Sequence, residues 1–207
     1  MLSDMMKIIG LTGGSGAGKT AVSACFEALG AGTVDADAVY RALCAENRQM
    51  LSELDAAFGG VLTAEGALDR PKLAAIVFSN PDKLKRLNEI TFPYIRAASK
   101  AQFMERAESG HAIILYDAPT LFQTGADRMC DAVIGVIASR ETRICRIMAR
   151  DGIAEQAAAA RIDSQPDADF YRRRCDFIIE NDGDLESLTR QAQEIWTAWE
   201  RGTEHGA

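Results

Sequence analysis

The stretch from Ile8 to Thr20 reads IIGLTGGSGAGKT and decides the fold. Its apolar start, residues 8–12, predicts a short buried strand that runs directly into glycines. Residues 19–29 then follow helical spacing, and residues 33–35 predict a second brief strand. A strand, a glycine loop, a helix and a second strand in this order open a βαβ unit, which predicts a parallel sheet.

The glycine loop satisfies the pattern G-x-x-x-x-G-K-[ST] in full. Glycines let backbone N–H groups turn inward around phosphate oxygens, and the positive end of the following helix favours the same anion. Lys19 is expected to reach the β- and γ-phosphates of a nucleoside triphosphate, and the Thr20 hydroxyl to ligate Mg²⁺. The predicted phosphate-binding residues are Gly13, Gly14, Ser15, Gly16, Ala17, Gly18, Lys19, Thr20 and Ala21.

Two other classes of protein compete with an NTP-dependent enzyme. Residues 16–21 also match G-x-G-x-x-[GA], with Asp35 and Asp37 near the distance of a ribose-binding acid, as in a dinucleotide-dependent oxidoreductase. That motif begins at the strand end, which is not the case here, and it leaves the lysine–threonine pair without a role. A non-catalytic NTP-dependent switch is the second rival, although no Asn-Lys-x-Asp motif for guanine is present.

Composition narrows the class further. The 207 residues suit one domain, and 23 basic against 30 acidic residues give a net charge of −7, which disfavours nucleic acid as a partner. Five cysteines without C-x-x-C spacing predict reduced thiols in the cytoplasm, and two histidines, His111 and His205, disfavour a histidine-rich metal site. No signal peptide or membrane segment is recognised, which agrees with a cytoplasmic protein. For assembly we expect a monomer or weak homo-oligomer.

The rest of the chain predicts an α/β, three-layer P-loop NTPase fold in a single domain, residues 1–207, with a sheet of about five strands. A helical insert over about 36–110 has the character of a substrate-binding subdomain, in which Phe92-Pro93 is expected to interrupt a helix. Asp69 and Asn80 are expected to cap helices there. Three further strands are predicted at 112–117, 132–137 and 177–179. An arginine-rich helical stretch is predicted at about 139–175 and a final helix at about 185–200.

Acidic residues follow two of the predicted strands, where ligands bind in parallel sheets. Either Asp35 or Asp37 could accept a proton from a substrate hydroxyl. The alternative is that both acids cap the next helix, and the phosphate loop nearby favours the catalytic interpretation. Asp117 either holds Mg²⁺-bound water or caps a turn. Arg41 either pairs with Asp37 one helical turn earlier or binds a substrate phosphate.

The chain resembles the dephospho-CoA kinase family over about residues 7–200. The motif Asp-Ala-Asp-x-x-x-Arg at Asp35–Arg41 is more specific than the loop, which many families share. The segments that carry the resemblance are 9–20, 35–41, 58–59, 68–70, 87–93, 117–122, 146–152, 161–165 and 176–183. Two positions depart from the family pattern, Phe92 where it usually has histidine and Gln123 where it usually has glutamate.

The resemblance implies an enzyme that uses ATP and Mg²⁺ to phosphorylate the ribose 3′-hydroxyl of dephospho-CoA, with another small-metabolite kinase as the alternative. It implies that Asp37 is the base, that the helical insert holds the substrate, and that residues 139–175 form a lid over ATP. Residues 140–174 contain eight arginines and six acids. From the motif, Arg146 and Arg150 are the predicted catalytic arginines, although a solvated helix face explains their spacing too.

Overall fold

A computed structural model describes residues 6–204, with side chains placed as far as residue 200. His205 lies outside the described residues. The chain divides into two compact units, one comprising Met1–Thr33 and Arg106–Ala207 and the other comprising Val34–Glu105. Among the described residues, no helix is both long enough and apolar enough to cross a bilayer.

A five-stranded sheet forms the centre of the first unit, in the order β2-β3-β1-β4-β5. In register, β1 pairs in parallel with both β3 and β4, and β4 pairs in parallel with β5. The sheet confirms the predicted α/β class and the expected number of strands. The strands are β1 (Lys7–Gly13), β2 (Gly32–Asp35), β3 (Ile113–Asp117), β4 (Ala132–Ile137) and β5 (Phe177–Glu180).

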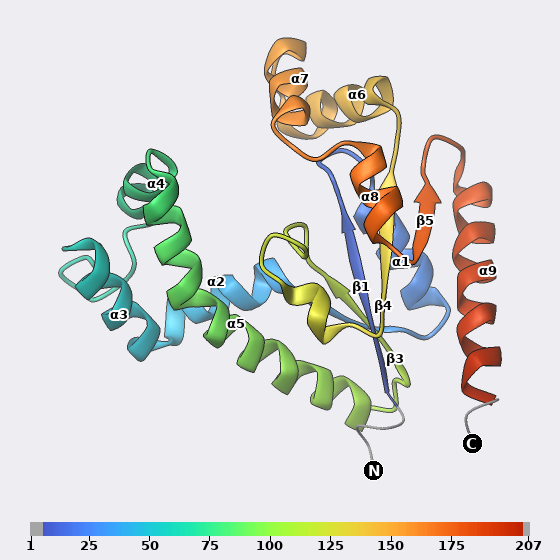
Figure 1. Cartoon of the computed structure of the whole chain (residues 1–207), viewed down its shortest axis with the longest axis horizontal. Coiled ribbons are helices and arrows are strands. Elements are labelled where there is room, and N and C mark those ends of the chain that lie inside the picture. The colour runs from blue at the N-terminus through green and yellow to red at the C-terminus, as the bar shows by residue number, and fades with distance from the viewer. Residues whose placement is uncertain (1–5, 205–207) are drawn as a thin grey trace. The chain divides into compact units, whose positions relative to one another are not determined.

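Helices cover this sheet, and two of them bury one of its faces. Val22 and Phe26 of α1 and Leu188 and Trp196 of α9 join one apolar cluster with the sheet side chains, and Figure 1 shows both helices beside the strands. The Phe26 and Trp199 rings stack with centroids 5.6 Å apart. The helices of this unit are α1 (Lys19–Ala28), α6 (Arg140–Asp151), α7 (Glu155–Asp163), α8 (Ala168–Arg174) and α9 (Leu185–Glu204), with a 3₁₀ turn at Ala126–Met129.

The second unit is helical, with an isolated bridge between Leu62 and Leu68 and the end of β2 as its extended pieces. Its helices begin at side-chain caps: Asp69 accepts from the Lys72 N–H at 3.0 Å, and Asn80 accepts from the Asp82 N–H at 2.9 Å. Both caps confirm the expected helix starts. The helices are α2 (Ala36–Glu46), α3 (Arg48–Phe58), α4 (Arg70–Phe78) and α5 (Pro81–Glu108).

The expected interruption at Phe92-Pro93 is wrong, because α5 continues through Pro93. A proline in a helix removes one backbone hydrogen bond and costs about 3 kcal/mol. Ile90 is buried, and it joins one apolar cluster with Leu87 before the proline and Tyr94 after it. Packing on both sides of Pro93 therefore holds the helix together where local preference would end it.

The core predicts a large stability cost for Phe26→Ala. Phe26 is 0% exposed, so truncation leaves a cavity beneath α9 and is expected to lower the free energy of unfolding by about 3–5 kcal/mol. Phe78→Ala is the matched control, because Phe78 is 76% exposed and its loss is expected to change stability by less than about 0.5 kcal/mol. Denaturant unfolding of both variants measures the difference, and equal effects would contradict this packing.

Candidate functional site

The predicted phosphate loop connects the end of β1 at Gly13 to the start of α1 at Lys19. Two of its glycines have left-handed backbone angles, with φ of 77° at Gly16 and 93° at Gly18. A Cβ on Gly18 would lie 2.1 Å from Asn181 Nδ2, so neither the backbone nor the space around it admits a side chain. The glycines of the motif are therefore required by the shape of the loop.

The loop leaves several amide groups without protein acceptors. Within the described residues, the N–H groups of Gly16, Gly18, Lys19 and Thr20 donate to no protein atom, and no side chain caps α1. Unsatisfied N–H groups at a helix start carry partial positive charge and bind anions. The loop therefore fits the phosphates of a nucleotide.

The carbonyl groups of the same loop are satisfied by distant side chains. Arg143 Nε donates to Ser15 O at 2.9 Å, and Asn181 Nδ2 donates to Ala17 O at 2.8 Å. Arg146 Nη1 lies 3.4 Å from the carbonyl oxygens of both Gly16 and Ala17. The structure thus brings predicted Arg146 to the loop, together with two residues that sequence reasoning did not select.

Arg150 lies in a different setting. Its Nε donates to Asp151 at 2.7 Å, and Arg161 pairs with the same carboxylate. The hydrogen bonds from Arg150 and then Arg161 hold the pKa of Asp151 well below its usual range. Arg150 is 61% exposed in its side chain, so the geometry places it in a surface ion-pair cluster and gives no support to its predicted catalytic role.

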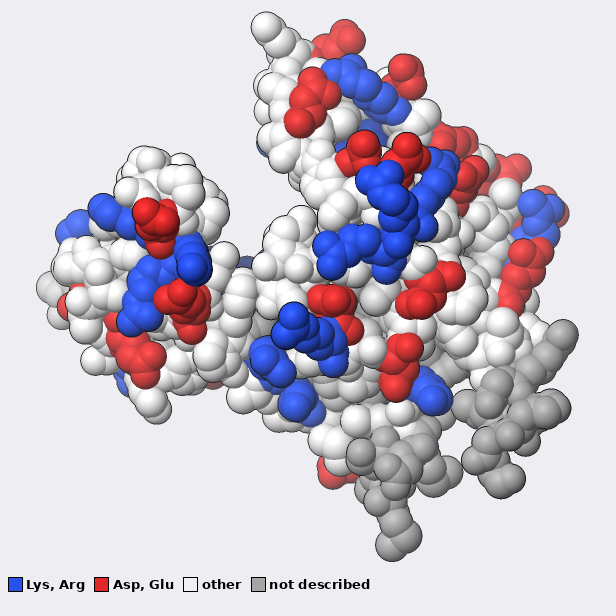
Figure 2. All heavy atoms as spheres, in the orientation of Figure 1, with Lys and Arg blue, Asp and Glu red and all other residues white. Residues whose placement is uncertain are grey.

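Other arginines of this region also have structural partners. Figure 2 shows basic side chains gathered over α8 with acidic side chains around them. Arg172 bonds to Glu180 at 2.8 Å, and the Arg174 guanidinium lies 4.5 Å from the centroid of the Phe122 ring. The basic surface over α8 is therefore engaged largely within the protein.

Asp117 and Thr20 are the predicted metal-binding residues. Asp117 ends β3 opposite Leu11 of β1, two residues before the phosphate loop begins, and Thr20 is the second residue of α1. No group of three or more His, Cys, Asp or Glu side chains able to hold a metal occurs among the described residues. Mg²⁺ takes one or two protein oxygens and completes its shell with phosphate and water, so a hydroxyl and a carboxylate are donors of the kind it prefers.

The structure separates the roles of the two aspartates after β2. Asp35 caps α2, since its Oδ1 accepts from the N–H groups of Asp37 at 2.8 Å and Ala38 at 3.1 Å. Arg41 lies 3.5 Å from Asp35 Oδ2, so its predicted ion pair forms with Asp35 rather than with Asp37. The Asp37 carboxylate is exposed in the first turn of α2 and takes no part in the cap. Capping therefore accounts for Asp35 and leaves Asp37 available for a substrate.

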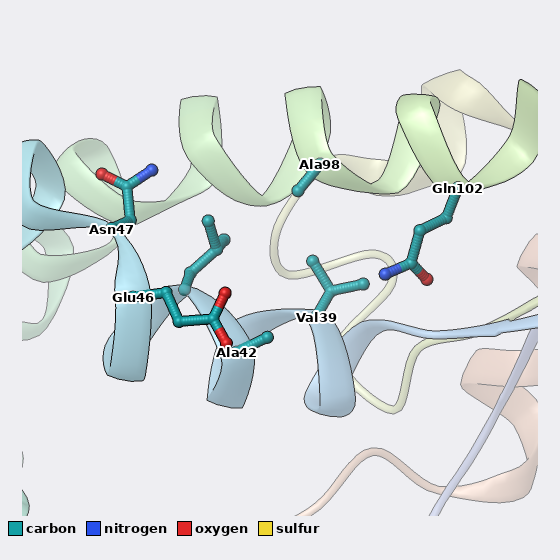
Figure 3. A pocket seen from close by; sticks show the side chains of 7 residues that line it. Val39, Ala42, Glu46, Asn47, Ala98 and Gln102 are labelled. Carbon is teal, nitrogen blue, oxygen red and sulfur yellow. The ribbon is translucent and has the colours of Figure 1, made fainter. Parts of the chain in front are cut away.

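A hollow of about 330 Å³ lies between α2 and α5 within the helical unit. Figure 3 shows Val39 of α2 pointing toward Ala98 and Gln102 of α5. A lining of aliphatic side chains with two amides and one carboxylate suits a ligand that combines alkyl and polar groups. The lining residues are Val39, Ala42, Leu43, Glu46, Asn47, Ala98 and Gln102.

Comparison with known proteins decides the family. A family model described as dephospho-CoA kinase matches residues 7–187. The chain belongs to the dephospho-CoA kinase family. A dephospho-CoA kinase of Anaeromyxobacter dehalogenans is 40% identical over 191 residues, which cover 92% of this chain and 90% of the relative. One from Arabidopsis thaliana is 37% identical, and the match covers 92% of this chain and 82% of the relative.

Solved structures agree with this membership. A Thermus thermophilus protein called TT1252 superposes with a TM-score of 0.77 at 32% identity, covering 93% of this chain and 97% of the other. A dephospho-CoA kinase from Campylobacter jejuni gives a TM-score of 0.69 at 28% identity, covering 96% of this chain and 100% of the other. The family membership confirms the resemblance seen in the sequence. It rules against the two alternative interpretations, a dinucleotide-dependent oxidoreductase and a non-catalytic switch.

Sequence reasoning missed Arg143, Gln165 and Asn181 as residues of the site. Gln165 contacts the loop residue Ser15 through both its amide atoms. Gln165 and Asn181 lie in two of the segments that carry the family resemblance, 161–165 and 176–183, and this is the one signal that pointed to them. No local pattern connects them with the loop, because each lies 150 or more residues away along the chain.

The crowding at Gly18 predicts that Gly18→Ala impairs nucleotide binding. The added Cβ must displace the Asn181 amide, and we expect the affinity for ADP to fall at least about tenfold. Gly152→Ala is the control: Gly152 has φ of 65°, and a Cβ there meets nothing within 4 Å. That control is expected to cost about 1 kcal/mol of stability and to leave ADP binding unchanged. Calorimetric titration measures the ADP affinity of both variants. Equal affinities would contradict the prediction that a side chain at position 18 impairs nucleotide binding.

Proposed function

We propose that this protein transfers the γ-phosphoryl group of ATP to the ribose 3′-hydroxyl of dephospho-CoA, giving CoA and ADP. The observation that carries the proposal is the complete phosphate loop, with unsatisfied N–H groups, in a chain that matches the dephospho-CoA kinase model over residues 7–187. The direct test is ADP release by purified protein with dephospho-CoA, compared with a panel of nucleosides and adenylates. Faster turnover of another acceptor would assign the chain to a different metabolite.

The loop residues bind and orient the donor nucleotide. The N–H groups of Gly16, Gly18, Lys19 and Thr20 and the Lys19 ammonium stabilise negative charge on the phosphates as it shifts during transfer. Thr20 and Asp117 would hold Mg²⁺, directly or through water. When bound, the nucleotide supplies the phosphoryl group and the metal neutralises charge on its oxygens.

Asp37 is proposed as the residue that orients the acceptor hydroxyl and accepts its proton. Two features support it: Asp37 lies two residues beyond the carboxyl end of β2, and its carboxylate is not used in capping. In a loose phosphoryl-transfer transition state the base contributes mainly by orienting the nucleophile. We propose that Asp35 and Arg41 support the acceptor site, with Asp35 acting chiefly through the start of α2.

The cysteines bear on the cellular compartment of the protein. Cys25, Cys44, Cys130, Cys145 and Cys175 are all free thiols. Burial, then nearby Asp176, raises the pKa of Cys175 to about 12, so this thiol resists oxidation at neutral pH. Unpaired thiols suit a reducing compartment, and we propose the cytoplasm. A monomer or weak homo-oligomer remains the prediction for assembly.

Lys19→Ala is expected to lower kcat by about a thousandfold or more while the protein stays folded, because the ammonium stabilises transferring charge and contributes little to packing. Lys85→Ala, at an exposed lysine of α5, is the control for loss of one charge. Steady-state kinetics and thermal unfolding measure both effects. A Lys19→Ala variant that turns over near the wild-type rate would remove the kinase assignment.

Asp37→Asn is expected to reduce kcat about a hundredfold to ten-thousandfold with nearly unchanged ATP binding, because it removes the proton acceptor and keeps the shape. Asp35→Asn is expected to have a smaller effect, since asparagine also caps helices well. Kinetics with dephospho-CoA varied and nucleotide titration separate the two residues. If Asp35→Asn is the more damaging change, the base is misassigned by two positions.

A further inference from the structure

Gln165 forms two hydrogen bonds with one residue of the phosphate loop, Ser15. It follows the end of α7, in the segment that leads to α8. The Ser15 N–H donates to Gln165 Oε1 at 2.8 Å, and Gln165 Nε2 donates to Ser15 Oγ at 2.9 Å. An amide is suited to this contact because one of its ends accepts while the other donates.

Arg143 completes a closed set of hydrogen bonds around this contact. Its Nη2 donates to Gln165 Oε1 at 3.0 Å, and its Nε donates to Ser15 O at 2.9 Å. Arg143 is 8% exposed, so its guanidinium is held among these partners rather than moving in solvent. The N–H, the carbonyl and the hydroxyl of Ser15 therefore all have fixed partners.

Helix α7 has apolar packing against α6 that is separate from this contact. Ile144 and Ile147 of α6 pack against Ala158 and Ile162 of α7 in an apolar cluster of their own. Loss of the Gln165 amide would remove the two hydrogen bonds to the N–H and the hydroxyl of Ser15 and leave this apolar packing in place.

We propose that Gln165, aligned by Arg143, is a positioning residue that fixes the conformation of the phosphate-binding loop before the nucleotide arrives. We assign the Gln165 amide no direct contact with the nucleotide. Its effect on binding is transmitted through Ser15. A loop held in one conformation avoids the entropy loss of ordering on binding, and its donors need no rearrangement when charge moves. The inference rests on the proposed nucleotide-binding role of the loop.

The test replaces the amide with a side chain of similar length that forms no strong hydrogen bond. In the full chain, Gln165→Met is expected to weaken ADP binding by about tenfold to a hundredfold, and to raise the KM for ATP by a similar factor. The KM for dephospho-CoA is expected to stay within about twofold of the wild-type value, because these hydrogen bonds involve only the phosphate loop. Hydrogen–deuterium exchange of residues 13–18 in the nucleotide-free protein is expected to accelerate.

Arg140→Met is the matched control. Arg140 is the first residue of α6, and its Nη2 lies 3.0 Å from Asp163 Oδ2 at the end of α7. Its loss removes a surface ion pair between α6 and α7. It is expected to leave ADP affinity and loop exchange unchanged. Arg143→Lys, which keeps the charge and loses the planar fork, is expected to weaken ADP binding in the same direction as Gln165→Met.

The proposal is overturned if Gln165→Met binds ADP within twofold of the wild type, or if Arg140→Met loses as much affinity. Should Gln165→Met fail to fold, Ser15→Ala serves instead; it removes only the hydroxyl partner and is expected to weaken ADP binding about threefold. ADP titration needs no acceptor. A wild-type protein that binds ADP but leaves dephospho-CoA unchanged would refute the proposed function and leave this inference intact.

Discussion

A nucleotide loop of this kind depends on how its carbonyl groups are satisfied. Each buried peptide group needs a partner for both its N–H and its C=O. Here the N–H groups at the start of α1 remain available for an anion, so the C=O groups of Ser15, Gly16 and Ala17 must find donors elsewhere. Two arginines of α6 and one asparagine after β5 supply them. The shape of the loop is therefore a property of the whole α/β unit.

The strand order explains why these donors reach the loop. β1 lies at the centre of the sheet, between β3 and β4, and β5 pairs with β4. Asp117 therefore ends the strand on one side of β1, while α6 follows the strand on the other side, and Asn181 follows β5. Parallel strands bring all these carboxyl ends to one edge, where the ligands of such sheets bind. Segments far apart in the sequence thus meet beside the same turn.

The sequence was informative where the determinants are local. The strand, loop and helix at residues 7–28 and the caps at Asp69 and Asn80 depend on neighbouring residues, and each could be predicted. Pro93 could not, because packing on both sides of it overrides a local preference. The residues alone did not distinguish the two aspartates after β2, and only the family resemblance selected Asp37 as the base. Hydrogen-bond geometry now identifies Asp35 as the residue that caps α2.

The arginines of α6 show the limit of spacing as evidence. Arg143, Arg146 and Arg150 share one helix face, yet only the first two contact the loop, and Arg150 pairs with Asp151 at the end of the helix. Whether each arginine reaches the loop depends on how α6 lies against it in the fold. The spacing of residues within α6 does not reveal this. Gln165 lies 150 residues from Ser15 and was visible only as part of a family motif.

Arg143 connects this architecture to the chemistry of the site. It is 8% exposed, and its hydrogen-bond partners are the neutral oxygens of Ser15 and Gln165. Burial lowers the pKa of Arg143, against a smaller opposing effect of Tyr171, because a charged guanidinium is poorly solvated there. A buried cation without a neighbouring carboxylate is costly in the free protein and becomes favourable when an anion occupies the loop. The same side chain that fixes the loop therefore also places a positive charge beside it, which favours an anion there.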